Sequence, residues 1–75
     1  MRIEVELLTD HTGESVPTRF RLGKDWVPVT AVIDRWLARE HRYFKVSAGV
    51  DRYIVRQDVP KDVWDLTFFL ANGSR

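Results

Sequence analysis

Basic and aromatic residues interleave through the middle of this 75-residue chain, and no other pattern in the sequence points as clearly to chemistry. Residues 19–56 hold nine basic and four acidic residues, a net charge of +5, whereas the whole chain carries +1. Small barrels that bind single-stranded nucleic acid combine cations for phosphates with rings that stack on bases. The sequence therefore predicts a nucleic-acid-binding surface. Its candidate cations are Arg19, Arg21, Arg42, Lys45, Arg52 and Arg56, and its candidate exposed rings are Trp26, Tyr43 and Tyr53.

Protein binding is the alternative function that the same residues allow. Acidic residues interrupt the basic segment, and a pI near 8.2 is below that typical of dedicated nucleic-acid domains. Exposed rings such as Trp26 and Tyr53, or a free sheet edge, would instead receive a peptide or a second copy of the chain. We expect a monomer or a weak homodimer.

Catalytic and metal sites have little support in the sequence. The chain has no cysteine, and its serines lie in no nucleophile motif. His11 lies near Asp10 and Glu14, but a loop with one histidine is typical of a solvated polar turn rather than a metal site. His41 is interpreted as a surface residue. We therefore predict no enzymatic activity, no metal and no cofactor.

Composition describes one small soluble domain. The chain is 44% hydrophobic and 31% charged, which is typical of a globular fold and leaves room for a single domain, residues 1–75. Glu4 and Glu6 interrupt the start of the chain, where a secretory signal would be apolar, and no run approaches the roughly 18 apolar residues of a membrane span. We expect a cytoplasmic protein without a membrane partner.

Short runs that alternate apolar and polar residues predict strands along most of the chain. The expected strands are residues 2–8, 18–22, a strand from Trp26, the hairpin 43–47 and 52–56, and 63–70. Residues 9–17 are expected to form a polar loop and residues 71–75 a frayed tail. The phase of the alternation places Phe20, Trp36, Phe44 and Trp64 in the core.

Residues 29–40 allow two interpretations. Val29, Val32, Ile33, Trp36 and Leu37 follow the spacing of an amphipathic helix. The run of β-branched residues equally favours a strand, and a bulge near Ile33 or Asp34 would let both Val29 and Trp36 face inward. The fold class is therefore all-β, a small barrel of five or six antiparallel strands, with α+β and one helix at residues 30–40 as the alternative.

A family resemblance adds to this prediction. The segments that carry it are Pro17–Gly23, Val29, Val32–Trp36, Tyr43–Val46, Tyr53–Asp58 and Val63–Leu66. Over residues 17–66 the chain resembles a group of small bacterial barrel domains of uncharacterised function, some of them appended to or encoded beside Y-family translesion DNA polymerases. The resemblance implies an SH3-like barrel in which Val29–Trp36 is a bent strand, and it implies no catalytic residues.

Overall fold

The computed structural model describes residues 1–71, and all of its regular structure is antiparallel β-sheet. The strands are β1 (Arg2–Thr9), β2 (Ser15–Leu22), β3 (Asp25–Pro28), β4 (Ala31–Ala38), β5 (His41–Ala48), β6 (Asp51–Asp58) and β7 (Val63–Leu70). The all-β prediction is confirmed, whereas the expected count of five or six strands is wrong. The described residues contain no helix, and so none that crosses a membrane.

β4 resolves the ambiguity at residues 29–40 in favour of a strand. Its register with β5 shifts between Val32 and Asp34, so Ile33 forms a bulge where the sequence suggested one. The helix alternative is wrong, because the β-branched side chains fit an extended edge strand that pairs with β5. The predicted effect of the bulge is also wrong: Trp36 lies opposite Tyr43, on the face away from the core.

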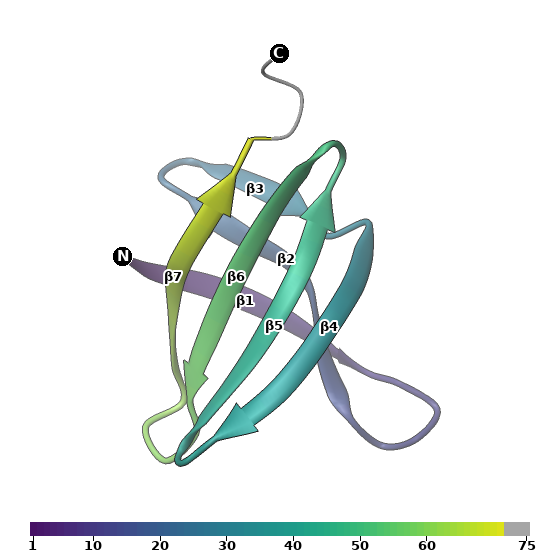
Figure 1. Ribbon diagram of the computed structural model, residues 1–75, viewed down its shortest axis with the longest axis vertical. Coiled ribbons are helices and arrows are strands. Elements are labelled where there is room, and N and C mark those ends of the chain that lie inside the picture. The colour runs from purple at the N-terminus through teal and green to yellow at the C-terminus, as the bar shows by residue number, and fades with distance from the viewer. Residues whose placement is uncertain (72–75) are drawn as a thin grey trace.

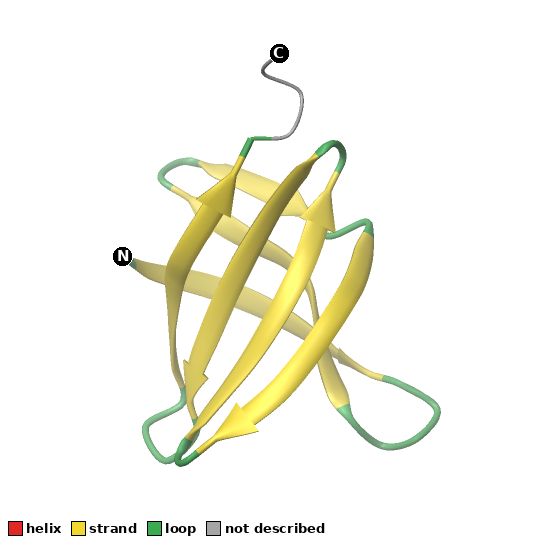
Figure 2. Cartoon of the chain, in the orientation of Figure 1, coloured by secondary structure: helices red, strands yellow, loops and turns green. Residues whose placement is uncertain are grey.

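The strands form one sheet of order β3-β2-β1-β7-β6-β5-β4, curled into a half-barrel. In Figure 1, β1–β3 run behind β4–β7 and across their direction, so the sheet folds into two layers that face each other. β1 and β7 join the layers through only two residue pairs, Arg2 with Asp65 and Ile3 with Trp64. On the opposite side β3 and β4 end the sheet unpaired, connected by a short loop (Figure 2).

Tight turns connect the strands within each layer. The hairpin predicted at residues 43–56 is confirmed, with Gly49 at φ 65° in its two-residue turn, a conformation that glycine adopts without strain. Leu22 and Asp25 flank a similar turn at Gly23. The loop predicted at residues 9–17 is shorter than expected, because β2 already begins at Ser15.

The core fills the space between the two layers. Its fully or nearly fully buried hydrophobic residues are Ile3, Phe20, Phe44, Val46, Tyr53, Val55 and Trp64. The core positions predicted for Phe20, Phe44 and Trp64 are confirmed. Tyr53 was expected to be exposed and is only 7% exposed, because its strand phase turns the ring inward onto Phe20, with ring centroids 4.9 Å apart. Residues 72–75 of the predicted frayed tail lie outside the described residues.

Candidate nucleic-acid interface

The six predicted cations do not form one patch. The structure places Arg19 and Arg21 on the outside of the three-stranded layer, and Arg42 between the layers. Lys45, Arg52 and Arg56 lie on the outside of the four-stranded layer, because each alternates with a core residue along its strand. Each location has different neighbours and a different capacity to bind a ligand.

Acidic side chains of β1 neutralise Arg19 and Arg21. The Arg19 guanidinium donates hydrogen bonds to both carboxylate oxygens of Glu6, at 2.7 and 3.0 Å, and Arg21 donates to Glu4 at 3.5 Å. The hydrogen bond from Arg19 lowers the pKa of Glu6 below its usual value. Arg19 also covers the Trp26 ring, 4.4 Å from its centroid. Two predicted cations and one predicted exposed ring are therefore held in contacts within the protein.

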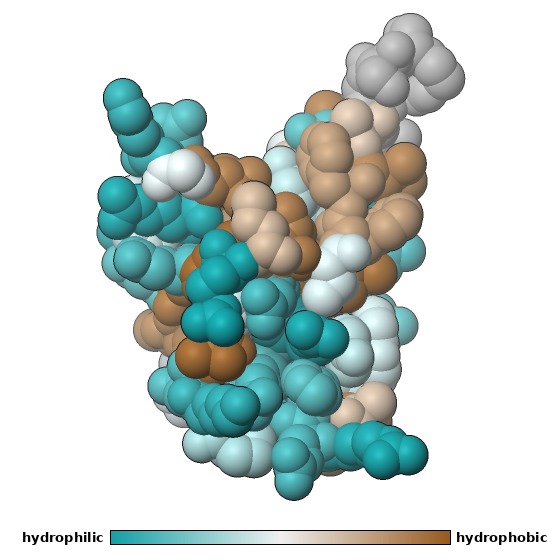
Figure 3. Space-filling view, turned by 90° about the vertical axis from the view of Figure 1, so that its left-hand side faces the viewer, coloured by the Kyte–Doolittle hydropathy of each residue, from teal (hydrophilic) through white to brown (hydrophobic). Residues whose placement is uncertain are grey.

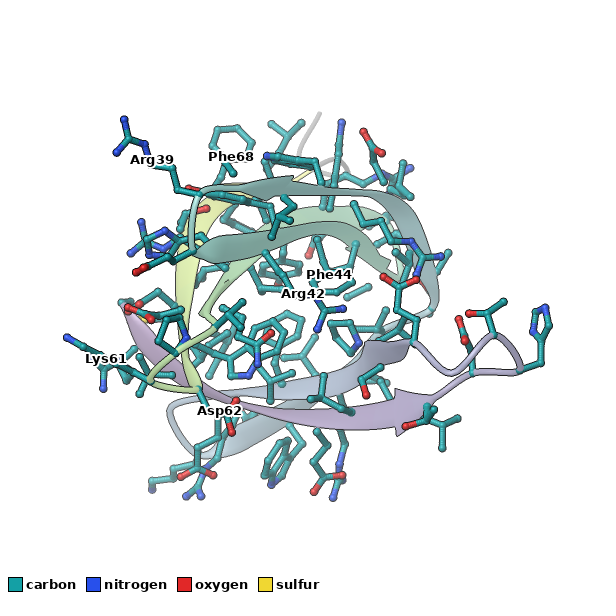
Figure 4. All side chains as sticks on the ribbon, turned by 90° about the horizontal axis from the view of Figure 1, so that it is seen from below. Arg39, Arg42, Phe44, Lys61, Asp62 and Phe68 are labelled. Carbon is teal, nitrogen blue, oxygen red and sulfur yellow. The ribbon has the colours of Figure 1, made fainter. Side chains whose placement is uncertain are left out.

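Arg42 connects the two layers from inside the half-barrel. Its guanidinium donates to the Ser15 carbonyl at 2.9 Å and to Gln57 Oε1 at 3.3 Å, and it lies 3.6 Å from the Glu14 carboxylate. It also lies over the Phe44 ring, 4.9 Å from the centroid. Figure 4 shows Arg42 and Phe44 in the space between the layers. The Arg42 guanidinium is therefore held by contacts within the protein.

The outer surface of the four-stranded layer carries the remaining candidates, and we call it the β4–β7 face. Its cross-strand rows follow from the register: Asp34–Lys45–Ile54–Phe68, Trp36–Tyr43–Arg56–Asp65 and Ser47–Arg52–Leu70. Within residues 1–71, neither Lys45 nor Arg52 has a carboxylate at ion-pair distance. Arg56 lies 3.5 Å from Asp65, which also contacts Arg2 at 3.6 Å.

Aromatic rings flank these cations at both sides of the β4–β7 face. On the β4 side the Trp36 and Tyr43 rings are stacked, with centroids 5.2 Å apart and planes 2° from parallel, and Trp36 is 41% exposed. On the β7 side Phe68 is 52% exposed, and Figure 4 shows it pointing away from the core. Of the predicted exposed rings, only Tyr43 lies here, half-buried beneath its partner.

Two ring positions of the β4–β7 face were missed from the sequence. The expected bulge was predicted to turn Trp36 inward together with Val29. Val32 instead lies opposite the core residue Val46, so the shift after it turns Trp36 outward, opposite Tyr43. Unbroken alternation over the expected strand 63–70 would place Phe68 on the same face as Trp64. A second register shift, between Ile54 and Val55, instead lets Leu66 and Phe69 share the inner face while Phe68 turns outward. The β-branched run before Trp36 was the only sequence signal for either bulge.

The uneven charge distribution of the sequence is largely cancelled by folding. Three acidic residues near the N-terminus pair with arginines of the basic middle segment. Glu4 pairs with Arg21, and Glu6 pairs with Arg19. Glu14 pairs with both Arg35 and Arg42. Figure 3, a view from the β7 side coloured by hydropathy, shows mostly hydrophilic residues over the three-stranded layer and hydrophobic residues near the C-terminal end of β7, where Phe68, Phe69 and Leu70 are exposed. The basic segment is therefore not a continuous basic surface.

The residues weighed as metal ligands serve local structure. The Asp10 carboxylate accepts hydrogen bonds from the Thr12 hydroxyl and from the backbone N–H groups of Thr12 and Glu14. The Thr12 hydroxyl contributes most to lowering the pKa of Asp10. This is the arrangement of a polar turn that ties its own backbone. His41 is the first residue of β5, and its Nε2 atom lies 3.9 Å from Oδ2 of Asp58, the last residue of β6.

Comparisons with protein-family models, with curated proteins and with solved structures found no match.

Proposed function

We propose that this protein is a non-enzymatic module that binds single-stranded nucleic acid on the β4–β7 face. The observation that supports this best is the position, between exposed rings, of two cations that form no ion pair with any residue of 1–71. Lys45 and Arg52 lie between Trp36 on β4 and Phe68 on β7. Cations would contact phosphates while the rings stack on bases, and stacking of this kind tolerates any sequence.

The size of the face suits a short strand. Neighbouring strands lie about 4.8 Å apart, so β4 and β7 are separated by about 14 Å. Four-stranded sheets that bind RNA stack two or three bases on such a surface. Phe68 offers one platform, and the side of Trp36 that faces away from Tyr43 offers another. An unstacked single strand is therefore favoured over a duplex, whose bases are already stacked on one another.

The family resemblance supports this proposal. Domains appended to or encoded beside translesion polymerases would work where single-stranded DNA is present. We also propose that the fold is an SH3-like barrel, as the resemblance implies. Protein binding is the alternative function, favoured by the exposed Phe68 and Leu70 on this face.

The proposal is tested by fluorescence anisotropy with two labelled single strands, oligothymidylate DNA and oligoadenylate RNA. A labelled DNA duplex is the comparison. We expect single strands to bind at low salt, with affinity falling as salt rises by a slope of about 0.7 per phosphate contact. Lys45→Ala should lower that slope by about 0.7, the amount expected for one phosphate contact. Phe68→Ala should weaken binding by about tenfold. Lys24→Ala is the matched control, since Lys24 is exposed in the turn between β2 and β3.

Two results would contradict the proposal. Absence of oligonucleotide binding at low ionic strength would leave the β4–β7 face as a protein-binding surface, the alternative function. Equal weakening by Lys45→Ala and Lys24→Ala would mean that the whole molecule attracts nucleic acid through its net charge, without a site on this face.

A further inference from the structure

Among residues 1–71, β4 is the longest free edge of the sheet. The sheet ends at β3 and at β4, and β3 has only four residues, one of them Pro28. β4 has eight residues and carries three exposed large hydrophobic side chains: Ile33, Trp36 and Leu37, the last 70% exposed. Unpaired backbone groups beside exposed apolar side chains are the features that promote pairing with another strand.

The bulge protects only the first part of this edge. Bulges and charged residues are common devices against unwanted strand pairing. The shift at Ile33 interrupts pairing there, but residues 34–38 continue in regular register with β5. Along these residues Asp34, Trp36 and Ala38 lie on the outer face, opposite Lys45, Tyr43 and His41. Arg35 and Leu37 alternate with them on the inner face.

From this edge we infer that the protein forms a symmetric homodimer through antiparallel pairing of β4 with β4 of a second copy, with Trp36 opposite Trp36. Residues directly opposite in an antiparallel pair share a face, so the two-fold axis must pass through one residue position. With the axis at Trp36, Arg35 lies opposite Leu37 and Asp34 lies opposite Ala38. No like charges face each other in this register.

The neighbouring registers are less favourable. An axis at Asp34 or at Arg35 places a charged residue opposite its own copy, which is destabilising. An axis at Leu37 leaves only residues 36–38 in the ladder before the turn at Arg39. The second copy is also favoured over an unrelated strand, because the Trp36–Tyr43 stack would continue into the same pair of rings across the axis.

The dimer should be weak. One strand edge and its side chains bury less than the roughly 1,200 Å² that marks the lower limit of standard stable interfaces. We therefore expect association in the high micromolar range, about 100 μM. This inference does not depend on the proposed function, because the dimer is measured without nucleic acid.

Light scattering across a concentration series, from about 10 μM to about 1 mM, tests the association. We expect the mean mass to approach that of two chains at the high end. Leu37→Lys should keep the protein monomeric, because its ammonium group would lie opposite the like-charged Arg35 of the second copy, which is destabilising. Leu8→Lys is the matched control: Leu8 is 63% exposed on β1, far from this edge in the sheet order, and its variant should dimerise normally.

Disulfide trapping tests the register, and the absence of native cysteine makes it specific. The variants Asp34→Cys and Ala38→Cys, mixed in equal amounts and oxidised, should form the mixed disulfide faster than either variant alone. A strict monomer at the highest concentration would overturn the inference. So would a dimer that Leu37→Lys leaves intact, or preferential cross-linking of Arg35→Cys to itself.

Discussion

Arg42 lies between the layers and Lys45 lies on the β4–β7 face, and these positions predict opposite effects for substitutions of the two residues of β5. Arg42→Met removes two hydrogen bonds from a charged donor, to the Ser15 carbonyl and to Gln57, while the methionine stem still covers Phe44. Such bonds contribute about 1.5–3 kcal/mol each. The Arg42 side chain is 25% exposed, so water replaces part of the loss, and we expect a total of about 2 kcal/mol.

That loss is measurable in a domain of this size. About 2 kcal/mol should lower the melting temperature by roughly 10 °C and leave most molecules folded at 25 °C. Urea unfolding followed by tryptophan fluorescence gives the free energy directly. Oligonucleotide affinity of the folded Arg42→Met protein should be unchanged, because Arg42 lies between the layers.

Lys45→Met is the matched control on the opposite side of the same strand. It removes one charge from an exposed side chain without an ion pair, so stability should change by no more than about 0.5 kcal/mol. Its oligonucleotide affinity should fall. The reasoning is refuted if Arg42→Met leaves the free energy of unfolding unchanged, or if it weakens oligonucleotide binding as much as Lys45→Met does.

Three further predictions follow from the burial of the rings. In urea unfolding, Trp64→Ala should lower the free energy of unfolding by about 3–5 kcal/mol, because Trp64 is a core residue. Trp36→Ala should lower it by only about 1–1.5 kcal/mol, because Trp36 loses mainly its stack on Tyr43. Equal losses would contradict the assigned faces. Burial raises the pKa of Tyr53, so this group ionises first in the unfolded chain, near pH 10, and the free energy of unfolding should fall as the pH rises from there through the folded pKa. Tyr53→Phe should reduce this loss of stability at alkaline pH. An unchanged pH profile would argue against a buried hydroxyl. A saturating single-stranded oligonucleotide should lower the dimer fraction in light scattering, because both partners need the free side of Trp36; an unchanged fraction would show that bases do not stack there.

Local alternation was sufficient to predict most strands, but not the faces of their later residues. Phe44 and Val46 follow unbroken alternation and are buried as expected, because pairing on both sides keeps β5 in phase. Trp36 and Phe68 come after register shifts, and a shift of one residue moves every following side chain to the other face. The sequence suggested the bulge near Ile33, but the face that each residue takes after a shift depends on the partner strand, and this information is not local to the sequence.

The candidate site was predicted only in part for a similar reason. Lys45, Arg52 and Arg56 come together on adjacent strands, which the predicted β5–β6 hairpin already implied. The neutralisation of Arg19 and Arg21 depends on which strand lies beside β2. Composition reports the basic excess of the middle segment, but only the β1–β2 register reveals that Glu6 and Glu4 face these arginines.

The short junction between β1 and β7 has a consequence for how the chain folds. Every other ladder joins strands that are consecutive in the sequence, so each layer is a meander whose contacts form over short loops. The first strand meets the last only at the two residue pairs of Arg2 and Ile3 and at the hydrogen bonds between Met1 and Leu66 beside them, among residues 1–71. We therefore expect the meanders to condense independently and their docking to limit the folding rate. Separate peptides of residues 1–29 and 30–75 should accordingly recombine into the native molecule.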